Sequence, residues 1–101
     1  MPKILEQDSK KLLANVPEEY VFRCCDGRIL KNMLGLGEAF IRMKNETFSY
    51  HSNGERSDFA DWVRDIIGDG KLARDIERSP NKTRAANSVI ARIAFLHSKL
   101  S

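Results

Sequence analysis

Residues 48–67 decide how this chain folds, and they read Phe48-Ser-Tyr-His-Ser-Asn-Gly-Glu-Arg-Ser-Asp-Phe-Ala-Asp-Trp-Val-Arg-Asp-Ile-Ile67. An aromatic pair and a histidine lead into a turn that contains a glycine, and an amphipathic helix with the only tryptophan follows. Apolar side chains recur in that helix at spacings of three and four residues and form one stripe, Phe59, Trp62, Val63, Ile66 and Ile67. Because such a stripe has to be covered, the pattern predicts a helix at about 57–68 that packs on a core.

Two starts compete for this helix. Ser57 fits an N-cap, and Asp58 and Asp61 would then lie in the first turn, where the helix dipole favours negative charge. Ser52 and Glu55 have the spacing of a capping box, which would begin the helix one turn earlier.

Apolar periodicity predicts four further helices, at residues 4–16, 28–43, 71–78 and 82–100. Pro17 should end the first of them, because proline disfavours helix at the preceding residue. The second is apolar over about half its circumference, with Leu34 and Ile41 among its inward residues, so we expect it at the centre. Gly37 projects on the same side, which predicts that another element approaches the backbone closely there, with a kink in the helix as the alternative.

One short β element is expected near residues 19–25, where β-forming residues precede the turn pair Asp26-Gly27. A strand needs a partner for its backbone hydrogen bonds. Residues 47–51 are the best candidate within the chain, although a dimer could supply a strand instead.

These patterns predict a mainly α fold, a compact bundle of four to five helices with one short β element. The 101 residues suit a single domain. We divide it into an N-terminal helical arm (1–17), a core (18–80) and a basic C-terminal helix (81–101). No apolar run approaches the roughly 18 residues that span a bilayer, and the start of the chain lacks the apolar segment of a signal peptide. We therefore expect a cytoplasmic protein that binds no membrane.

Part of the pattern is shared with other proteins. The pairs Asp26-Gly27 and Leu72-Ala73, the aromatic-x-x-His segment Phe48–His51 and the Ser57-Asp58-Phe59-x-x-Trp62-Val63 helix resemble a family of small, chiefly archaeal domains of unknown function. The match covers roughly residues 20–78, and its specific part runs from His51 to Trp62. Some such domains stand alone and others are attached to enzymes such as glycosyltransferases, so the resemblance implies an accessory domain and supplies no catalytic residues.

His51 and Asp58 are the best acid–base candidates, since a carboxylate can orient an imidazole. Catalysis would also need a nucleophile, a substrate pocket or a metal, and no spacing in the sequence indicates one. The favoured interpretation is structural: His51 braces the turn into the tryptophan helix, and Asp58 satisfies backbone N–H groups. We therefore predict no catalytic, metal-binding or cofactor-binding residue.

For the other aromatic and sulfur side chains, a functional role also competes with a structural one. Trp62 and Phe59, with Phe48 and Tyr50, could form a stacking platform for bases or sugars, but their helical spacing favours core packing. Cys24 or Cys25 could be a redox thiol near Arg23 and Arg28, but cysteine is among the most buried residue types.

The excess of positive charge lies in the C-terminal third of the chain. Residues 71–101 hold seven basic and two acidic residues, a net charge of +5, so the chain total of +3 leaves −2 for residues 1–70. Phe95 lies opposite the apolar seam of this helix, whereas His97 falls within the seam and is expected to be a packed core histidine. An exposed aromatic among cations suits a protein interface or phosphate recognition with stacking. The candidate interaction residues are Lys82, Arg84, Arg92, Phe95 and Lys99.

The sequence therefore predicts a non-enzymatic accessory domain that binds a protein partner or itself through helix surfaces. The alternative is a nucleic-acid binder that contacts phosphates through the basic C-terminal helix. An enzyme with a site at His51 and Asp58 comes third.

Overall fold

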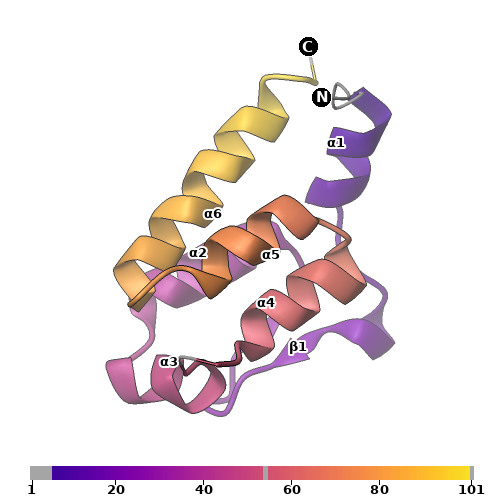
Figure 1. The fold of residues 1–101 in the computed structure, drawn as a ribbon. Coiled ribbons are helices and arrows are strands. Elements are labelled where there is room, and N and C mark those ends of the chain that lie inside the picture. Colours follow the sequence, from indigo (N-terminus) through magenta and orange to yellow (C-terminus); the bar gives the residue numbers. More distant parts are fainter. Residues whose placement is uncertain (1–5, 54, 101) are drawn as a thin grey trace.

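The computed structural model describes residues 6–53 and 55–100, and it is mainly helical with one small antiparallel sheet (Figure 1). In chain order its elements are α1 (Glu6–Leu13), a 3₁₀ turn (Glu18–Tyr20), β1 (Phe22–Arg23), β2 (Ile29–Leu30), α2 (Met33–Arg42), α3 (Asn45–His51), α4 (Asp58–Trp62), a π-helical segment (Val63–Ile67), α5 (Gly70–Glu77) and α6 (Lys82–His97). The predicted fold class is confirmed, with six α-helices in the described part where four or five were expected. None of the described helices is long and apolar enough to cross a membrane.

An aromatic cluster forms the centre of the core. The ring of Phe59 lies 4.9 Å from that of Phe40 and 5.0 Å from that of Phe22, between centroids, and Phe40 and Phe59 have no exposed surface. Trp62 meets Phe22 edge-on at 5.9 Å. Aromatic side chains each bury on the order of 150–250 Å², so this cluster supplies much of the hydrophobic free energy of folding. The tryptophan helix therefore packs inward, as its apolar stripe predicts.

The β element is a hairpin, and the predicted pairing with residues 47–51 is wrong. β1 pairs antiparallel with β2, with Phe22 opposite Leu30, while residues 47–51 lie in α3. Gly27 turns the chain with a φ of 96°, and the Arg28 N–H donates to Asp26 Oδ1 at 3.0 Å. A partner a few residues away costs less loop-closure entropy than one twenty residues away, which favours the local hairpin.

α2 begins later than predicted because Asn32 caps it. The Asn32 side chain accepts a hydrogen bond from the Gly35 N–H at 2.8 Å, so the residues before it are free to form β2. The prediction that Leu34 and Ile41 point inward is wrong, since they are 58% and 60% exposed. The core lies on the neighbouring stripe of α2, which consists of Met33, Leu36, Phe40 and Met43.

The close approach predicted at Gly37 is confirmed. A Cβ built on Gly37 would lie 3.1 Å from Cγ1 of Val89, so α6 packs directly on the α2 backbone. Figure 1 shows α6 next to α2, the helix that it contacts most.

The tryptophan helix begins at the later of the two predicted starts. Ser57 Oγ accepts a hydrogen bond from the Ala60 N–H at 3.1 Å, which makes Ser57 the N-cap. Beyond Trp62 the helix widens into the π-helical segment, and Gly68, with a φ of 91°, ends it. Asp69 then caps α5 by accepting from the Leu72 N–H at 3.1 Å.

The outer helices are shorter than predicted. α1 covers Glu6–Leu13, and the first two residues of the expected 4–16 helix lie outside the described part. The arm is tethered by a hydrogen bond of 2.8 Å from the Val16 N–H to the Lys31 carbonyl. α6 ends at His97, which is exposed rather than packed, because Leu96 takes the inward position at this end of the helix.

Candidate functional site

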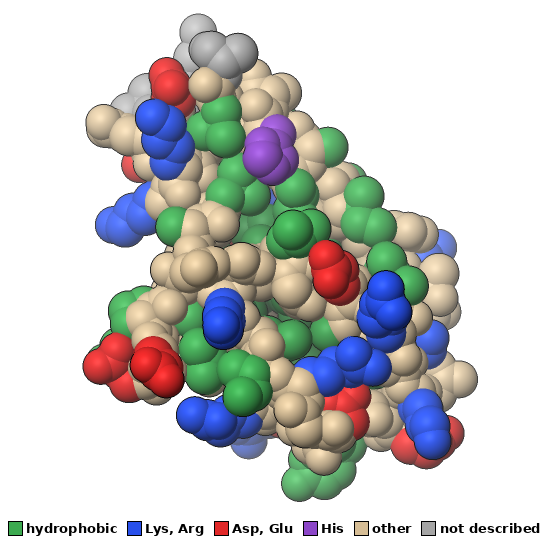
Figure 2. Space-filling model, turned by 180° about the vertical axis from the view of Figure 1, so that it is seen from behind, with side chains coloured by type: hydrophobic (Ala, Val, Ile, Leu, Met, Phe, Trp, Pro, Cys, Tyr) green, Lys and Arg blue, Asp and Glu red, His purple; other side chains and the backbone are tan. Residues whose placement is uncertain are grey.

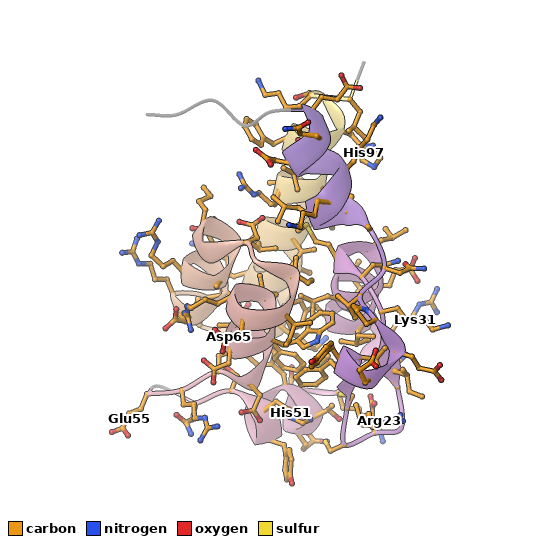
Figure 3. All side chains as sticks on the ribbon, turned by 90° about the vertical axis from the view of Figure 1, so that its right-hand side faces the viewer. Arg23, Lys31, His51, Glu55, Asp65 and His97 are labelled. Atoms are coloured by element: carbon orange, nitrogen blue, oxygen red, sulfur yellow. The ribbon has the colours of Figure 1, made fainter. Side chains whose placement is uncertain are left out.

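His51 lies at the end of α3, where the hairpin, α3 and the start of α4 meet (Figure 3). Its Nε2 accepts a hydrogen bond from the Cys25 backbone N–H at 3.0 Å, and its Nδ1 lies 3.1 Å from Asp58 Oδ2. A backbone N–H can only donate, so Nε2 is unprotonated, and Nδ1 carries the proton and donates it to the carboxylate. Both ring nitrogens are therefore occupied within the fold.

Aromatic rings enclose the same imidazole. The rings of Phe22, Tyr50 and Phe59 lie 5.1, 4.9 and 5.2 Å from it, centroid to centroid, and only 8% of His51 is exposed. A general base needs a free lone pair within reach of a substrate proton. This arrangement leaves none, so the geometry is that of a brace between the hairpin and α4.

Asp58 orients His51, and the prediction that it satisfies backbone N–H groups is wrong for the described residues, because Ser57 caps α4 instead. Its other carboxylate oxygen lies 3.6 Å from Nε of Arg56, which also lies 3.7 Å from Asp61. These contacts form an exposed ion network beside His51.

The motif residues of the tryptophan helix are internal. Trp62 is 7% exposed, and its Nε1–H donates to the Tyr20 carbonyl at 2.7 Å, which ties the 3₁₀ turn to α4. Phe59 is fully buried and Phe48 nearly so, whereas Tyr50 is 73% exposed. A stacking platform needs several exposed rings. These four aromatics do not provide one.

The two cysteines have different environments, and both are free thiols. Cys24 is buried, and burial raises the pKa of its thiol, whereas Cys25 is exposed. Beside them, hydrogen bonds from Arg28, first from its backbone N–H, hold the pKa of the Asp26 carboxyl below its usual range. Within the described part of the chain, no group of three or more His, Cys, Asp or Glu residues is placed to hold a metal ion.

The structure divides the predicted basic surface of the last helix. Arg92 makes a bidentate pair with Asp69, Nε to Oδ2 at 2.7 Å and Nη2 to Oδ1 at 3.1 Å, with the two side chains 10% and 2% exposed. Phe95 is 41% exposed, but Arg92 Cζ and Lys99 Nζ lie 5.2 and 5.1 Å from its ring centroid. Because its own cations contact the ring, less of it is available to stack on a ligand.

Lys82 is half-buried and Arg84 is exposed, and neither forms an ion pair with a described residue. The five candidates therefore do not act as one patch.

A different surface lies along the contact between α2 and α6. We define the α2–α6 face by Leu34, Glu38, Ile41 and Arg42 of α2 and Ile90 of α6, all exposed. Leu34 and Ile41 lie three and four residues from Gly37, on neighbouring turns of α2. Ile90 lies on α6 one residue after Val89, whose side chain approaches Gly37. Figure 2 shows the molecule from the side of α2, with hydrophobic side chains exposed among Lys and Arg side chains.

Sequence reasoning missed this face because it counted both apolar stripes of α2 as inward. One sequence feature could have revealed it. Glu38 shares a helix face with Leu34 and Ile41, at spacings of four and three residues, and an acidic residue on that face indicates that it is exposed to solvent.

A polar depression lies beside the ion network. It has a volume of about 70 Å³ and is lined by Asn53, Glu55, Arg56, Ser57 and Glu77. Pockets that enclose a small-molecule ligand usually measure roughly 300–1,000 Å³. This depression is too small to enclose a substrate.

No family model matches the chain, and no curated protein or solved structure is similar to it. The resemblance to the archaeal domain family stays a prediction.

Proposed function

We propose that this chain is a non-enzymatic interaction domain that binds a protein partner, or a second copy of itself, through the α2–α6 face. The observation that carries the proposal is the exposure of Leu34, Ile41 and Ile90, at 58%, 60% and 50%, on the two packed helices α2 and α6. Contiguous exposed apolar surface of this kind marks interaction sites in soluble proteins.

Covering a fully exposed aliphatic side chain contributes about 1.5–3 kcal/mol, so covering the exposed half of three such side chains contributes on the order of 3 kcal/mol. That supports a modest affinity when polar contacts at the rim add to it.

The rest of the molecule supports a role without catalysis. His51 has both nitrogens engaged, and the depression at Arg56 is small. An accessory role also agrees with what the family resemblance implies. The cytoplasmic location expected from the sequence is part of this proposal.

Site-specific photocrosslinking in the source cell tests the proposal. A benzophenone amino acid in place of Ile41 should yield a covalent adduct with a protein, identified by mass spectrometry. The same group in place of Arg74, an exposed residue of α5, is the control and should yield none. Equal labelling from both positions, or none from Ile41, would refute binding through this face.

The alternative function, nucleic-acid binding, is favoured by one observation. Arg74, Arg78 and Arg84 are exposed around the connection from α5 to α6, and none of them pairs with an acid in the described part. Phosphate contacts from such residues give an affinity that falls steeply with added salt. Titration with a labelled single-stranded DNA and RNA at two salt concentrations tests this function, and no association at low salt removes it.

A further inference from the structure

We infer that α1 is a strap that opens as a unit while the rest of the fold stays closed, and that its opening uncovers the C-terminal end of α6. This inference goes beyond the proposed function and concerns a different surface. The buried hydroxyl of Ser9 and the attachment of the arm carry it.

The arm is tethered beyond the end of α1, not along the helix itself. The Val16 N–H donates to the Lys31 carbonyl at 2.8 Å, and the Asn32 side-chain amide donates to Asn15 Oδ1 at 2.7 Å. Among the described residues, no hydrogen bond or ion pair joins residues 6–13 to another element, and the ion pair that α1 does contain lies within the helix. Apolar contacts alone therefore hold α1 against the core.

Those apolar contacts are limited. Leu12 and Leu13 of α1 pack against the core but stay only partly buried. α1 has 8 residues, and an isolated helix shorter than about 12–15 residues is only marginally stable in water. A strap that leaves the core therefore loses its helical structure as well, so release and unfolding of α1 are one event.

Ser9 weakens the closed state of the strap. Its side chain has no exposed surface, and its Oγ makes no hydrogen bond with any residue that the structure describes. A hydroxyl that leaves water without finding a partner costs free energy, and it regains its hydrogen bonds when the helix opens. Among the described side chains, Ser9 is the one with a buried polar atom in this condition, so this cost falls on the strap.

α1 lies beside the C-terminal end of α6, and two directions of view agree on this (Figure 1 and Figure 3). Leu96, one residue before the end of α6, has no exposed surface, and Ile93 is partly buried against the same core. Val89, two turns earlier on α6, lies against Gly37 of α2 instead. Opening of α1 should therefore admit water to Leu96 but not to Val89.

Amide hydrogen exchange of the purified full chain, followed by NMR, tests the inference residue by residue. Relative to their intrinsic rates, the amides of residues 10–13 should exchange about a hundredfold faster or more than those of Phe40 and Val89 in the core. The Val16 amide should stay protected, because its bond to the Lys31 carbonyl lies outside the strap. Equal protection of α1 and the core would overturn the inference, because α1 would then open only with the whole fold.

Ser9→Ala tests the cause of the opening. It should slow exchange of the α1 amides about tenfold or more, because it removes the unpaired hydroxyl from the closed state. The better helix propensity of alanine accounts for only about two- to threefold of this change. Gln7→Ala, at an exposed position of α1, is the matched control and measures that part. If Ser9→Ala slows exchange no more than the control does, the hydroxyl is not what weakens the strap and the inference fails.

Leu96→Cys and Val89→Cys test what the strap covers. Each variant replaces a fully buried apolar side chain of α6 by a thiol, and circular dichroism checks that both are folded. Iodoacetamide should modify the thiol at position 96 about tenfold faster or more than the thiol at position 89, because α1 opens more often than α2 separates from α6. Equal rates would show that α1 does not uncover the end of α6, and would overturn the inference.

Discussion

At the scale of single residues, the chemistry of the His51 motif is structural. The imidazole joins the Cys25 N–H to the Asp58 carboxylate, and Trp62 joins the 3₁₀ turn to α4 through one N–H. A side chain that connects two segments far apart in sequence stabilises the fold more than its own hydrogen bonds indicate, because it positions both segments for packing.

His51→Phe should destabilise the protein by about 1–3 kcal/mol. The new ring keeps the aromatic contacts, but the Cys25 N–H loses its acceptor, and an unpaired polar group in a partly buried position carries a desolvation penalty. Urea unfolding measures the change. Tyr50→Phe, at the exposed neighbouring position, is the control and should fall within about 0.5 kcal/mol of the wild type. A His51→Phe protein as stable as that control would contradict the brace.

The two thiols should differ in reactivity. Iodoacetamide should label Cys25 in the native protein and Cys24 only after unfolding, because Cys24 is buried and burial raises the pKa of its thiol. Peptide mapping by mass spectrometry distinguishes the two adducts, and Cys25→Ser is the control for assignment. Equal native labelling of both cysteines would show that the hairpin opens readily.

The same pKa direction predicts a loss of stability in alkali. The folded state holds the Cys24 proton more tightly than the unfolded state does. The contribution of this proton to the free energy of unfolding is therefore complete below about pH 8.5, and it is lost as pH rises through the folded pKa. The Asp26 carboxyl affects stability in acid instead. Its pKa is lowered in the folded state, so its contribution to the free energy of unfolding is present above about pH 4 and is lost on acidification. Urea unfolding between pH 7 and 10 should therefore show a decline that Cys24→Ala removes.

At the scale of elements, the α2–α6 contact explains the glycine in the middle of α2. Glycine costs about 1 kcal/mol in a helix interior relative to alanine. The 3.1 Å distance between a Cβ on Gly37 and Val89 Cγ1 shows what offsets that cost, which is direct packing of α6 on the α2 backbone. Valine in a helix has one strongly preferred rotamer, so it cannot turn aside easily.

Gly37→Ala should therefore destabilise the protein by about 1 kcal/mol, despite the better helix propensity of alanine, because the added methyl group overpacks the contact. Gly70→Ala is the matched control. A Cβ there meets no atom within 4 Å, and the change should stabilise by about 0.5 kcal/mol. Thermal and urea unfolding give both values. Two changes of the same sign and size would mean that α6 does not press on α2.

At the scale of the whole molecule, one buried ion pair joins the C-terminal helix to the rest. Arg92 of α6 and Asp69, the N-cap of α5, meet with little exposure to water. The pair orients α6 relative to α5, while the apolar contacts of α6 with α2 supply most of the burial. Arg92 therefore pairs within the chain, although the sequence indicates a surface residue.

Arg92→Met should destabilise the protein by about 3 kcal/mol, because it leaves the Asp69 carboxylate buried without its counter-charge. Lys99→Met is the control: Lys99 lies just beyond α6 and is exposed, its ammonium contacts the ring of Phe95, and its loss should cost less than about 1 kcal/mol. Urea unfolding measures both. An Arg92→Met protein of unchanged stability would return Arg92 to the list of binding candidates.

Much of this structure could be predicted from local patterns. The Ser57 cap, the tryptophan stripe and the turn at Asp26-Gly27 each depend on residues within a turn or two of one another, so the sequence contains the information. A glycine in an apolar helix indicated a close approach at Gly37, but not that Val89 makes it. The inward placement of Leu34, Ile41 and His97 failed for a common reason. Periodicity shows that a helix has an apolar side, but not how wide the core is that meets it.

The sequence by itself determined the type and approximate place of most elements, because helix caps, turn residues and apolar spacing act over short distances. The exception is α3, where residues 47–51 were expected as a strand. Only the tertiary structure decided which apolar side chains stay exposed and which charges are paired. β1 pairs with β2 in a hairpin, and Arg92 forms an ion pair with Asp69. Because the core is narrow where it meets α2, Leu34 and Ile41 stay exposed to solvent. Those choices depend on contacts between residues far apart in the chain, whose geometry no local spacing specifies.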